Sequence, residues 1–192
     1  GAVTPYLGAL TSKMRDAGAE VEATRERYRV RVTRPLTGVD VQTYPYPGFP
    51  TDLQAPFATA MTQAQGACAI HETMFDGRLL YVSELRRMGA RIDLSSGRTA
   101  IIHGPTPLRG TPVTALDIRS GAAMVLAGLA AEGTTHIGNV VYIDRGYENM
   151  DAKLRSLGAS IARVEENEHP CPQNDCEEPV DWTLHPLDDA AS

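Results

Sequence analysis

The sequence predicts an α/β fold built from repeated units, and three observations support this prediction. A short phrase centred on a Gly-Ala pair recurs at 14–21, 85–92 and 154–161, and its glycines, Gly18, Gly89 and Gly158, lie 71 and 69 residues apart. Segments with a period of two residues alternate with segments of helical spacing, and the connections between them are short. Finally, 42% of the 192 residues are hydrophobic, which is enough for a buried core.

Each copy of the phrase is typical of a helix that ends and a strand that begins. An apolar last turn carries an arginine, a glycine follows where the chain must adopt a left-handed conformation, and an aliphatic residue opens the strand. A period of about 70 residues indicates duplicated units. We expect two full units preceded by the end of a third, whose front is missing.

The elements before the middle phrase follow from caps, prolines and periodicity. Thr4-Pro5 begins a helix that runs to Gly18. Alternation from Val21 to Val32 predicts one half-buried strand with arginines on its solvated face. The remaining elements are a strand at 38–43, an ordered proline-rich loop at 44–50, a helix from 51 to about 65, a short strand at 67–71 and a helix at 83–88.

The elements after the middle phrase alternate in the same way. Residues 91–94 and 99–103 are predicted to form a hairpin. It is followed by a strand at 113–116, an alanine-rich helix at 121–132, a strand at 135–140, a turn at 144–146 and a helix at 148–157.

The charges divide the chain into a body and a tail. Residues 1–163 carry all 18 Lys and Arg together with 15 of the 24 acidic residues, and the rest of the chain carries the other nine acids. The weakly basic body does not favour nucleic acid, but it suits a small anionic substrate. The acidic end has four prolines and few aliphatic residues, so we predict one domain over 1–166 and a disordered tail over 167–192, with Trp182 as its one anchor.

Other function classes are disfavoured by what the sequence lacks. No apolar run is long enough to cross a membrane, and no signal peptide is visible. Three cysteines, an odd number spread over the chain, are not typical of a disulfide scaffold and favour the cytoplasm. Cys68 is predicted to be a buried structural thiol. Cys171 and Cys176 lie near two histidines, but their spacing is a weak metal signal, and we predict no metal or other cofactor.

The repeats place two pairs of candidate residues in equivalent positions. Asp52 and Asp117 each begin the central helix of a unit, and Arg78 and Arg145 each precede the closing helix. Asp52 is either a helix cap or a general base held at the mouth of a cleft.

The arginines leave similar alternatives. Arg145 either pairs with the neighbouring Asp144 or binds a carboxylate or phosphate through two parallel hydrogen bonds. Arg119 is expected to pair locally with Asp117.

Three segments resemble the UDP-N-acetylglucosamine 1-carboxyvinyltransferase (MurA) family of enolpyruvyl transferases. They are Phe49–Ala55 (FPTDLQA), Glu72–Arg78 (ETMFDGR) and Ile143–Glu148 (IDRGYE), supported by 87–90 and 126–128. The likeness spans residues 8–166 and matches the C-terminal portion of such an enzyme. It implies an inside-out α/β barrel domain built from βαβαββ units, here incomplete.

The resemblance also implies a reaction and its substrates. Family members move the enolpyruvyl group of phosphoenolpyruvate onto the 3′-hydroxyl of UDP-N-acetylglucosamine and release phosphate. This is the first committed step of peptidoglycan synthesis, on which cell-wall biogenesis, cell shape and cell division depend.

Individual positions take roles from the same resemblance. Asp52 matches the carboxylate that accepts the hydroxyl proton, and Arg145 matches the arginine that engages phosphoenolpyruvate. The backbone of Met74 matches the position that touches the uridine nucleotide. The other implied substrate-binding residues are Thr51, Thr73, Phe75, Arg78, Asp117 and Arg119.

The sequence departs from the family pattern in two ways. Met74 stands where Val or Ile is usual, and Asp76-Gly77 stands where Glu-Asn is usual. The family's reactive cysteine loop, Lys-Asn pair and nucleotide-contacting arginines have no match, so we expect a partial site that is inactive without an N-terminal half. The alternatives are a non-catalytic binding or scaffold fragment, and an enolpyruvyl transferase that acts on shikimate 3-phosphate.

Overall fold

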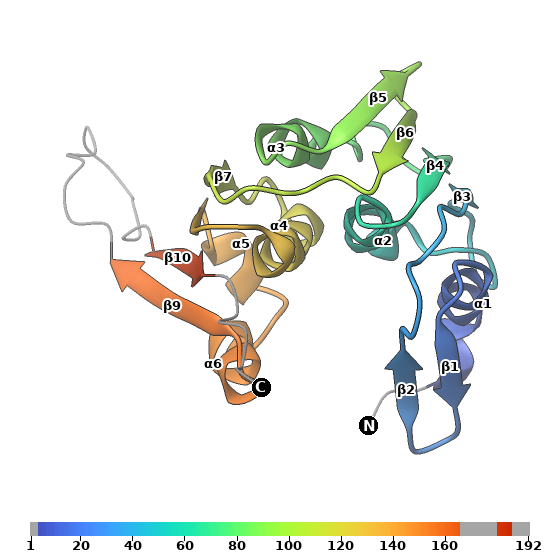
Figure 1. Ribbon diagram of the computed structural model, residues 1–192, viewed down its shortest axis with the longest axis horizontal. Helices are drawn as coiled ribbons and strands as arrows, with labels where there is room; N and C mark the ends of the chain where they lie inside the picture. The colour runs from blue at the N-terminus through green and yellow to red at the C-terminus, as the bar shows by residue number, and fades with distance from the viewer. Residues whose placement is uncertain (1–3, 166–179, 186–192) are drawn as a thin grey trace. The chain divides into compact units, whose positions relative to one another are not determined.

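The computed structural model describes residues 4–165 and 180–185 (Figure 1). The chain divides into two compact units, of which unit 1 comprises residues 1–82 and 90–106 and unit 2 comprises residues 83–89 and 107–192. Helix α3 (Tyr81–Arg87) crosses this division, with its first two residues in unit 1. No helix among the described residues is long and apolar enough to span a membrane.

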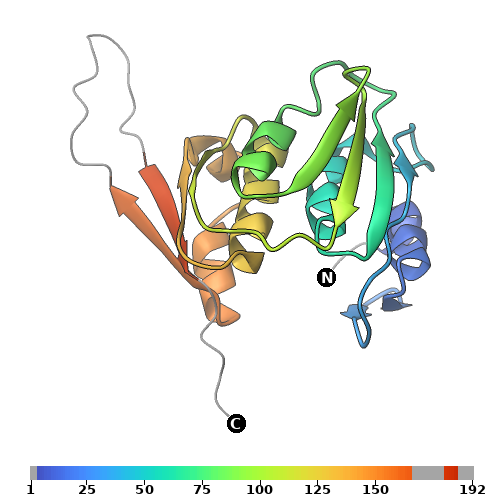
Figure 2. The ribbon, with the colours of Figure 1, turned by 45° about the horizontal axis from the view of Figure 1, so that its top comes forward.

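Unit 1 contains a hairpin and a four-stranded sheet. The 3₁₀ helix η1 (Thr4–Leu7) and helix α1 (Gly8–Asp16) precede the hairpin strands β1 (Glu20–Ala23) and β2 (Tyr28–Arg31). The sheet has the order β3-β4-β6-β5 and contains β3 (Val41–Gln42), β4 (Gly66–His71), β5 (Arg91–Ser95) and β6 (Thr99–Gly104). Between β3 and β4 the chain forms η2 (Thr51–Leu53) and helix α2 (Gln54–Met61), which lies against the sheet (Figure 2).

Unit 2 contains a second sheet of the same design. Its order is β7-β8-β10-β9, formed by β7 (Pro112–Thr114), β8 (Thr135–Gly138), β9 (Ser160–Glu165) and β10 (Val180–His185). Helix α4 (Ile118–Ala130) joins β7 to β8, and helices α5 (Val141–Asp144) and α6 (Met150–Ser156) join β8 to β9.

The two sheets share one connectivity. In each, the first two strands are parallel and the next two neighbouring pairs are antiparallel. In the segment that forms each sheet the chain order is strand, helix, strand, helical segment, strand, strand, although most of α3, the helical segment of the first sheet, is assigned to unit 2. Alternating apolar residues close each core, for example Ile70 and Ile102 in unit 1 and Ile137 in unit 2. The predicted α/β class is confirmed, whereas an inside-out barrel domain remains a prediction.

The three Gly-Ala phrases end helices as predicted. Gly18, Gly89 and Gly158 have φ angles of +99°, +99° and +98°, and each precedes a strand by two residues. The arginine of the phrase has a structural use in the first and last copies. Arg15 donates to the carbonyl of Val21 at 2.6 Å, and Arg155 donates to the carbonyl of Ile161 at 3.1 Å. These bonds fasten the helix end to the strand that follows.

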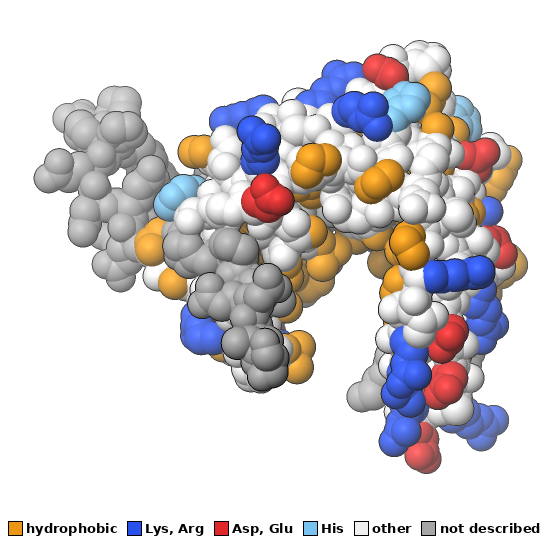
Figure 3. All heavy atoms as spheres, viewed as in Figure 1, with side chains coloured by type: hydrophobic (Ala, Val, Ile, Leu, Met, Phe, Trp, Pro, Cys, Tyr) orange, Lys and Arg blue, Asp and Glu red, His pale blue; other side chains and the backbone are white. Residues whose placement is uncertain are grey.

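The prediction of one strand over 21–32 was wrong, because the chain forms the hairpin β1–β2 there. Thr24 closes the turn: its backbone N–H donates to the carbonyl of Arg27, and its hydroxyl accepts the N–H of Arg27 at 3.0 Å. Acidic and basic side chains then face one another across the strands (Figure 3), with Glu20 opposite Arg31 and Glu22 opposite Arg29.

The prediction of a disordered tail was wrong for residues 180–185. They form β10, which lies in the middle of the unit 2 sheet and pairs with both β8 and β9. Leu184 is fully buried against α4, since a Cβ added to Gly128 would meet Leu184 Cδ1 at 2.5 Å. Residues 166–179 and 186–192, including Cys171 and Cys176, lie outside the described residues, as does the side chain of Trp182.

Candidate functional site

The turn that carries Asp52 is positioned by the ordered loop at 44–50. Proline restricts this loop, and backbone hydrogen bonds close it, from Tyr44 N–H to the Phe49 carbonyl and from Gly48 N–H to the Pro45 carbonyl. Phe49 is buried and packs edge-on against Phe57 of α2, with ring centroids 5.3 Å apart. The loop therefore delivers η2, and with it Asp52, to a fixed place at the start of α2.

Asp52 does not act as the cap of helix α2. The N-cap position belongs to Leu53, and no side chain caps it. The Asp52 side chain is 73% exposed, and one of its oxygens lies 3.3 Å from Nη1 of Arg78. That guanidinium also lies 4.4 Å from the centre of the Phe75 ring. Asp52 is thus an accessible carboxylate beside the Arg78 guanidinium, which lies over the Phe75 ring.

Glu72 is a central residue of this region that the sequence analysis did not single out. It directly follows β4, is 1% exposed, and accepts five hydrogen bonds. The donors are the hydroxyls of Thr43 and Thr51, the side-chain amide of Gln54, and the backbone N–H groups of Met74 and Phe75. The available signal in the sequence was an acidic residue placed directly after a predicted strand.

The segment after Glu72 is tied down by two further neighbours. Thr73 donates from its N–H to the Thr43 hydroxyl at 2.9 Å, and its own hydroxyl donates to the Thr43 carbonyl. Arg98 donates to the Thr73 carbonyl at 3.3 Å and pairs with Asp76 at 2.5 Å. Met74 and Phe75 remain exposed at the surface. The structure therefore brings together Thr51, Asp52, Thr73, Met74, Phe75 and Arg78 in unit 1.

The other predicted site residues, Asp117, Arg119 and Arg145, belong to unit 2. Asp117 caps helix α4: its carboxylate accepts the N–H groups of Arg119 and Ser120, both at 2.8 Å, and the Ser120 hydroxyl accepts the Asp117 N–H. The Arg119 guanidinium pairs with Asp117 at 2.7 Å, which confirms the predicted local pair.

Arg145 follows α5 and is exposed. The alternative in which it pairs with Asp144 was wrong, because Arg163 of β9 holds both Asp144 oxygens at 2.9 and 2.8 Å. These hydrogen bonds raise the pKa of Arg163. Arg145 instead lies 5.5 Å from the centre of the Tyr142 ring. Gly146 allows this turn to approach α4, since a Cβ there would overlap the Ile118 side chain.

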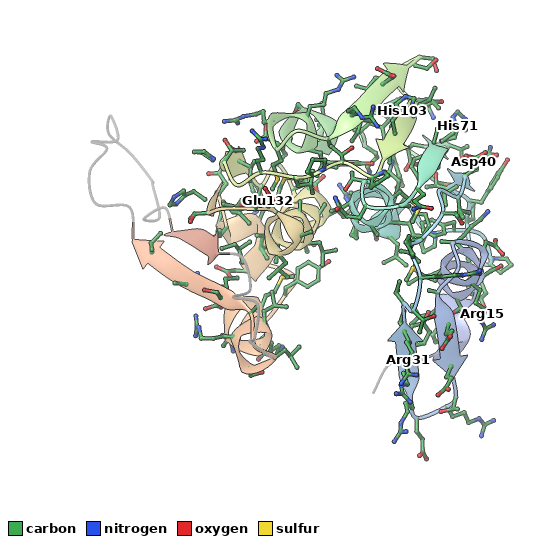
Figure 4. The ribbon with its side chains drawn as sticks, in the orientation of Figure 1. Arg15, Arg31, Asp40, His71, His103 and Glu132 are labelled. Carbon is green, nitrogen blue, oxygen red and sulfur yellow. The ribbon has the colours of Figure 1, made fainter. Side chains whose placement is uncertain are left out.

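Cys68 is buried in β4, as predicted, and burial raises the pKa of its thiol to about 11. Such a thiol is a poor nucleophile at neutral pH. His71 of β4 and His103 of β6 (Figure 4) are engaged with Thr99 and Asp93, respectively. Within the described part of the chain, no three His, Cys, Asp or Glu residues cluster as metal ligands would.

Comparison with known proteins identifies the family. A family model described as EPSP synthase (3-phosphoshikimate 1-carboxyvinyltransferase) matches residues 4–154. The chain belongs to the EPSP synthase family. The enolpyruvyl transferase NikO from Streptomyces tendae has a similar structure, with a TM-score of 0.74 at 27% identity over 79% of this chain and 35% of that chain. EPSP synthase from Acinetobacter baumannii shares the fold, with a TM-score of 0.62 at 15% identity over 93% of this chain and 39% of that chain.

Within the EPSP synthase family, curated relatives are much closer in sequence. UDP-N-acetylglucosamine 1-carboxyvinyltransferase from Gluconobacter oxydans is 49% identical over 158 residues, which cover 82% of this chain and 38% of the relative. The protein of the same name from Desulfofundulus thermocisternus is 48% identical over 159 residues, covering 83% of this chain and 65% of the relative. The resemblance to the MurA family is confirmed. The chain spans about two fifths of the length of the Gluconobacter oxydans relative and of two further relatives named for the same enzyme.

Proposed function

We propose that this chain carries the proton-accepting part of an enolpyruvyl transferase site for UDP-N-acetylglucosamine and phosphoenolpyruvate. The observation that carries the proposal is Asp52, which stands in the family motif as an exposed carboxylate beside Arg78 rather than as a helix cap. The relatives with 46–49% identity are named for this reaction, whereas identity to the EPSP synthase from Acinetobacter baumannii is 15%. The reaction would serve peptidoglycan synthesis in the cytoplasm.

The residues of the chain have defined tasks in the proposed reaction. The sugar 3′-oxygen forms a bond to the phosphate-bearing carbon of phosphoenolpyruvate, that carbon's bond to the phosphate oxygen breaks, and Asp52 accepts the hydroxyl proton. Arg145 and Arg78 are guanidinium groups suited to the anionic substrate. The backbone at Met74 and the Phe75 side chain receive the nucleotide sugar, with Thr51 and Thr73 at its edge. Asp117 and Arg119, at the start of α4, take the supporting role that the family resemblance implies.

The part of the enzyme that binds phosphoenolpyruvate most directly is proposed to come from an N-terminal half. Without those groups, electrostatic stabilisation of the anionic substrate is mostly lost. The chain alone should therefore bind UDP-N-acetylglucosamine weakly and release no phosphate.

A chimera tests the proposal. The matched 158-residue segment of the Gluconobacter oxydans relative is replaced by the corresponding part of this chain. Phosphate release is then measured with phosphoenolpyruvate and either UDP-N-acetylglucosamine or shikimate 3-phosphate. We expect turnover by the chimera with the nucleotide sugar and none by the chain alone.

Other outcomes would support the alternatives. Turnover by the isolated chain would overturn the partial site, and a preference for shikimate 3-phosphate would favour the activity named in the family description. A folded but inactive chimera would favour a non-catalytic binding or scaffold fragment.

A further inference from the structure

Glu72 presents an unusual combination of burial and charge. Its side chain is almost inaccessible to solvent, yet the partners recorded for it among the described residues are neutral hydroxyl, amide and backbone N–H groups. A buried carboxylate is tolerated only when hydrogen bonds replace its lost hydration. The network around Glu72 therefore has to hold its donors in place.

The five donors saturate this carboxylate. Oε1 accepts from the Thr43 hydroxyl at 2.9 Å, from the Met74 N–H at 2.8 Å and from the Phe75 N–H at 3.3 Å. Oε2 accepts from the Thr51 hydroxyl at 2.8 Å and from the Gln54 amide at 3.5 Å. A carboxylate offers about four lone-pair sites. No site is left for a substrate proton, which argues against an acid–base role.

The donors also connect two segments that the proposed reaction uses. Thr51 directly precedes Asp52 in η2, and Met74 and Phe75 form the exposed segment after β4. We propose that Glu72 is the positioning residue of this site, whose carboxylate holds the Asp52 turn and the 73–75 backbone together as one rigid element. The effect of this positioning on nucleotide binding rests on the proposed function.

The two oxygens of Glu72 can be tested separately. In Glu72→Gln the amide oxygen must face the N–H groups of Met74 and Phe75, because those donors cannot accept a hydrogen bond. The new NH₂ group then faces Thr51 and Gln54, whose side chains can turn to accept. Glu72→Gln should keep the 73–75 backbone in place, and Glu72→Ala should release it. Thr51→Val removes only the link to the Asp52 turn, and Thr51→Ser restores it.

Residue-resolved amide hydrogen exchange on the full chain measures both links. Glu72→Ala should speed exchange at Met74 and Phe75 by about tenfold or more, and Glu72→Gln should change it by less than about threefold. Thr51→Val should speed exchange at Leu53, whose N–H donates to the Pro50 carbonyl, and leave Met74 unchanged. Ile70 and Ile102 are the internal controls, since a merely structural loss would speed exchange there equally.

A titration with UDP-N-acetylglucosamine, followed through the amide signals, completes the test. Glu72→Ala should weaken binding about tenfold or more, and Glu72→Gln should bind within about threefold of wild type. Equal effects of Glu72→Ala and Glu72→Gln on the amides, or no effect of either, would overturn the positioning role. If Glu72→Ala does not fold, Glu72→Gln and the Thr51 pair decide the question. If the wild-type chain does not bind UDP-N-acetylglucosamine, that result counts against the proposed function. The hydrogen-exchange pattern still tests the positioning role of Glu72, because it does not depend on sugar binding.

Discussion

Asp52 and Asp117 each lie just before the central helix of their unit, but their surroundings differ. The carboxylate of Asp117 is occupied by two backbone N–H groups and by Arg119, and it closes the first turn of α4. The Asp52 side chain caps no helix and is 73% exposed, with Arg78 at 3.3 Å. Repeated units thus place the same residue type at the same point, and local partners decide whether it stabilises a helix or remains accessible.

The difference arises in the residues next to each aspartate. In unit 2 the chain enters α4 directly, so Asp117 reaches the free N–H groups of its first turn. In unit 1 the 3₁₀ turn η2 precedes α2, and the Thr51 hydroxyl is held by Glu72. In this arrangement the Asp52 side chain makes no cap hydrogen bond to α2. A structural aspartate and a candidate base are therefore distinguished by their partners rather than by their position in the repeat.

The largest predicted effect concerns the strand that completes unit 2. Leu184→Ala should destabilise this unit by about 2–5 kcal/mol, because it leaves a cavity between β10 and α4. The loss of stability is measured by urea unfolding, with residue-resolved hydrogen exchange as the readout for unit 2. Leu157→Ala is the matched control, since Leu157 is 84% exposed in the same unit. Equal stability of the two variants would show that β10 is not integral to unit 2.

The two aspartates should respond differently to removal. Asp117→Ala should cost about 0.5–2 kcal/mol through loss of the helix cap. Asp52→Ala should cost less than about 1 kcal/mol, because an exposed ion pair contributes little. Hydrogen exchange of the α4 amides reports the stability of unit 2, and exchange of the α2 amides reports the stability of unit 1. A larger cost for Asp52→Ala would contradict the contrast between the two residues.

The thiol of Cys68 should react slowly, in contrast to the accessible carboxylate of Asp52 in the same unit. A pKa of about 11 rather than the ordinary 9.0 leaves about 100-fold less thiolate at pH 8. Alkylation by iodoacetamide, mapped at the Cys68 peptide, should accelerate about tenfold per pH unit from pH 8 to 10. The chain in urea is the control and should level off above pH 9. A folded-state rate that levels off there too would show that burial does not protect the thiol.

Much of the fold could be predicted because its signals are local. The Gly-Ala phrases mark helix ends by the left-handed glycine that each requires, and the alternation at 91–103 predicted the β5–β6 hairpin correctly. The local pair of Asp117 and Arg119 and the burial of Cys68 also follow from short-range pattern.

The errors came from tertiary context that overrides composition. Acidic residues and prolines predicted a tail that could not fold. Within this tail, however, the hydrophobic residues Val180, Trp182 and Leu184 alternate with polar ones. This short segment forms strand β10 by backbone hydrogen bonding with β8 and β9. The period-two pattern at 21–32 continues through a turn, so periodicity did not reveal the hairpin. Glu72 was missed because its donors come from segments 18 to 29 residues away as well as from its neighbours.

The central claim is that Asp52 accepts the hydroxyl proton in enolpyruvyl transfer. The most direct test is phosphate release by the chimera with and without Asp52→Asn, at saturating phosphoenolpyruvate and UDP-N-acetylglucosamine. Loss of a general base predicts a fall in kcat of about 10²–10⁴-fold, with the melting temperature unchanged. A variant that retains kcat within about threefold of the parent chimera would contradict the claim, because general-base catalysis would then not depend on this carboxylate.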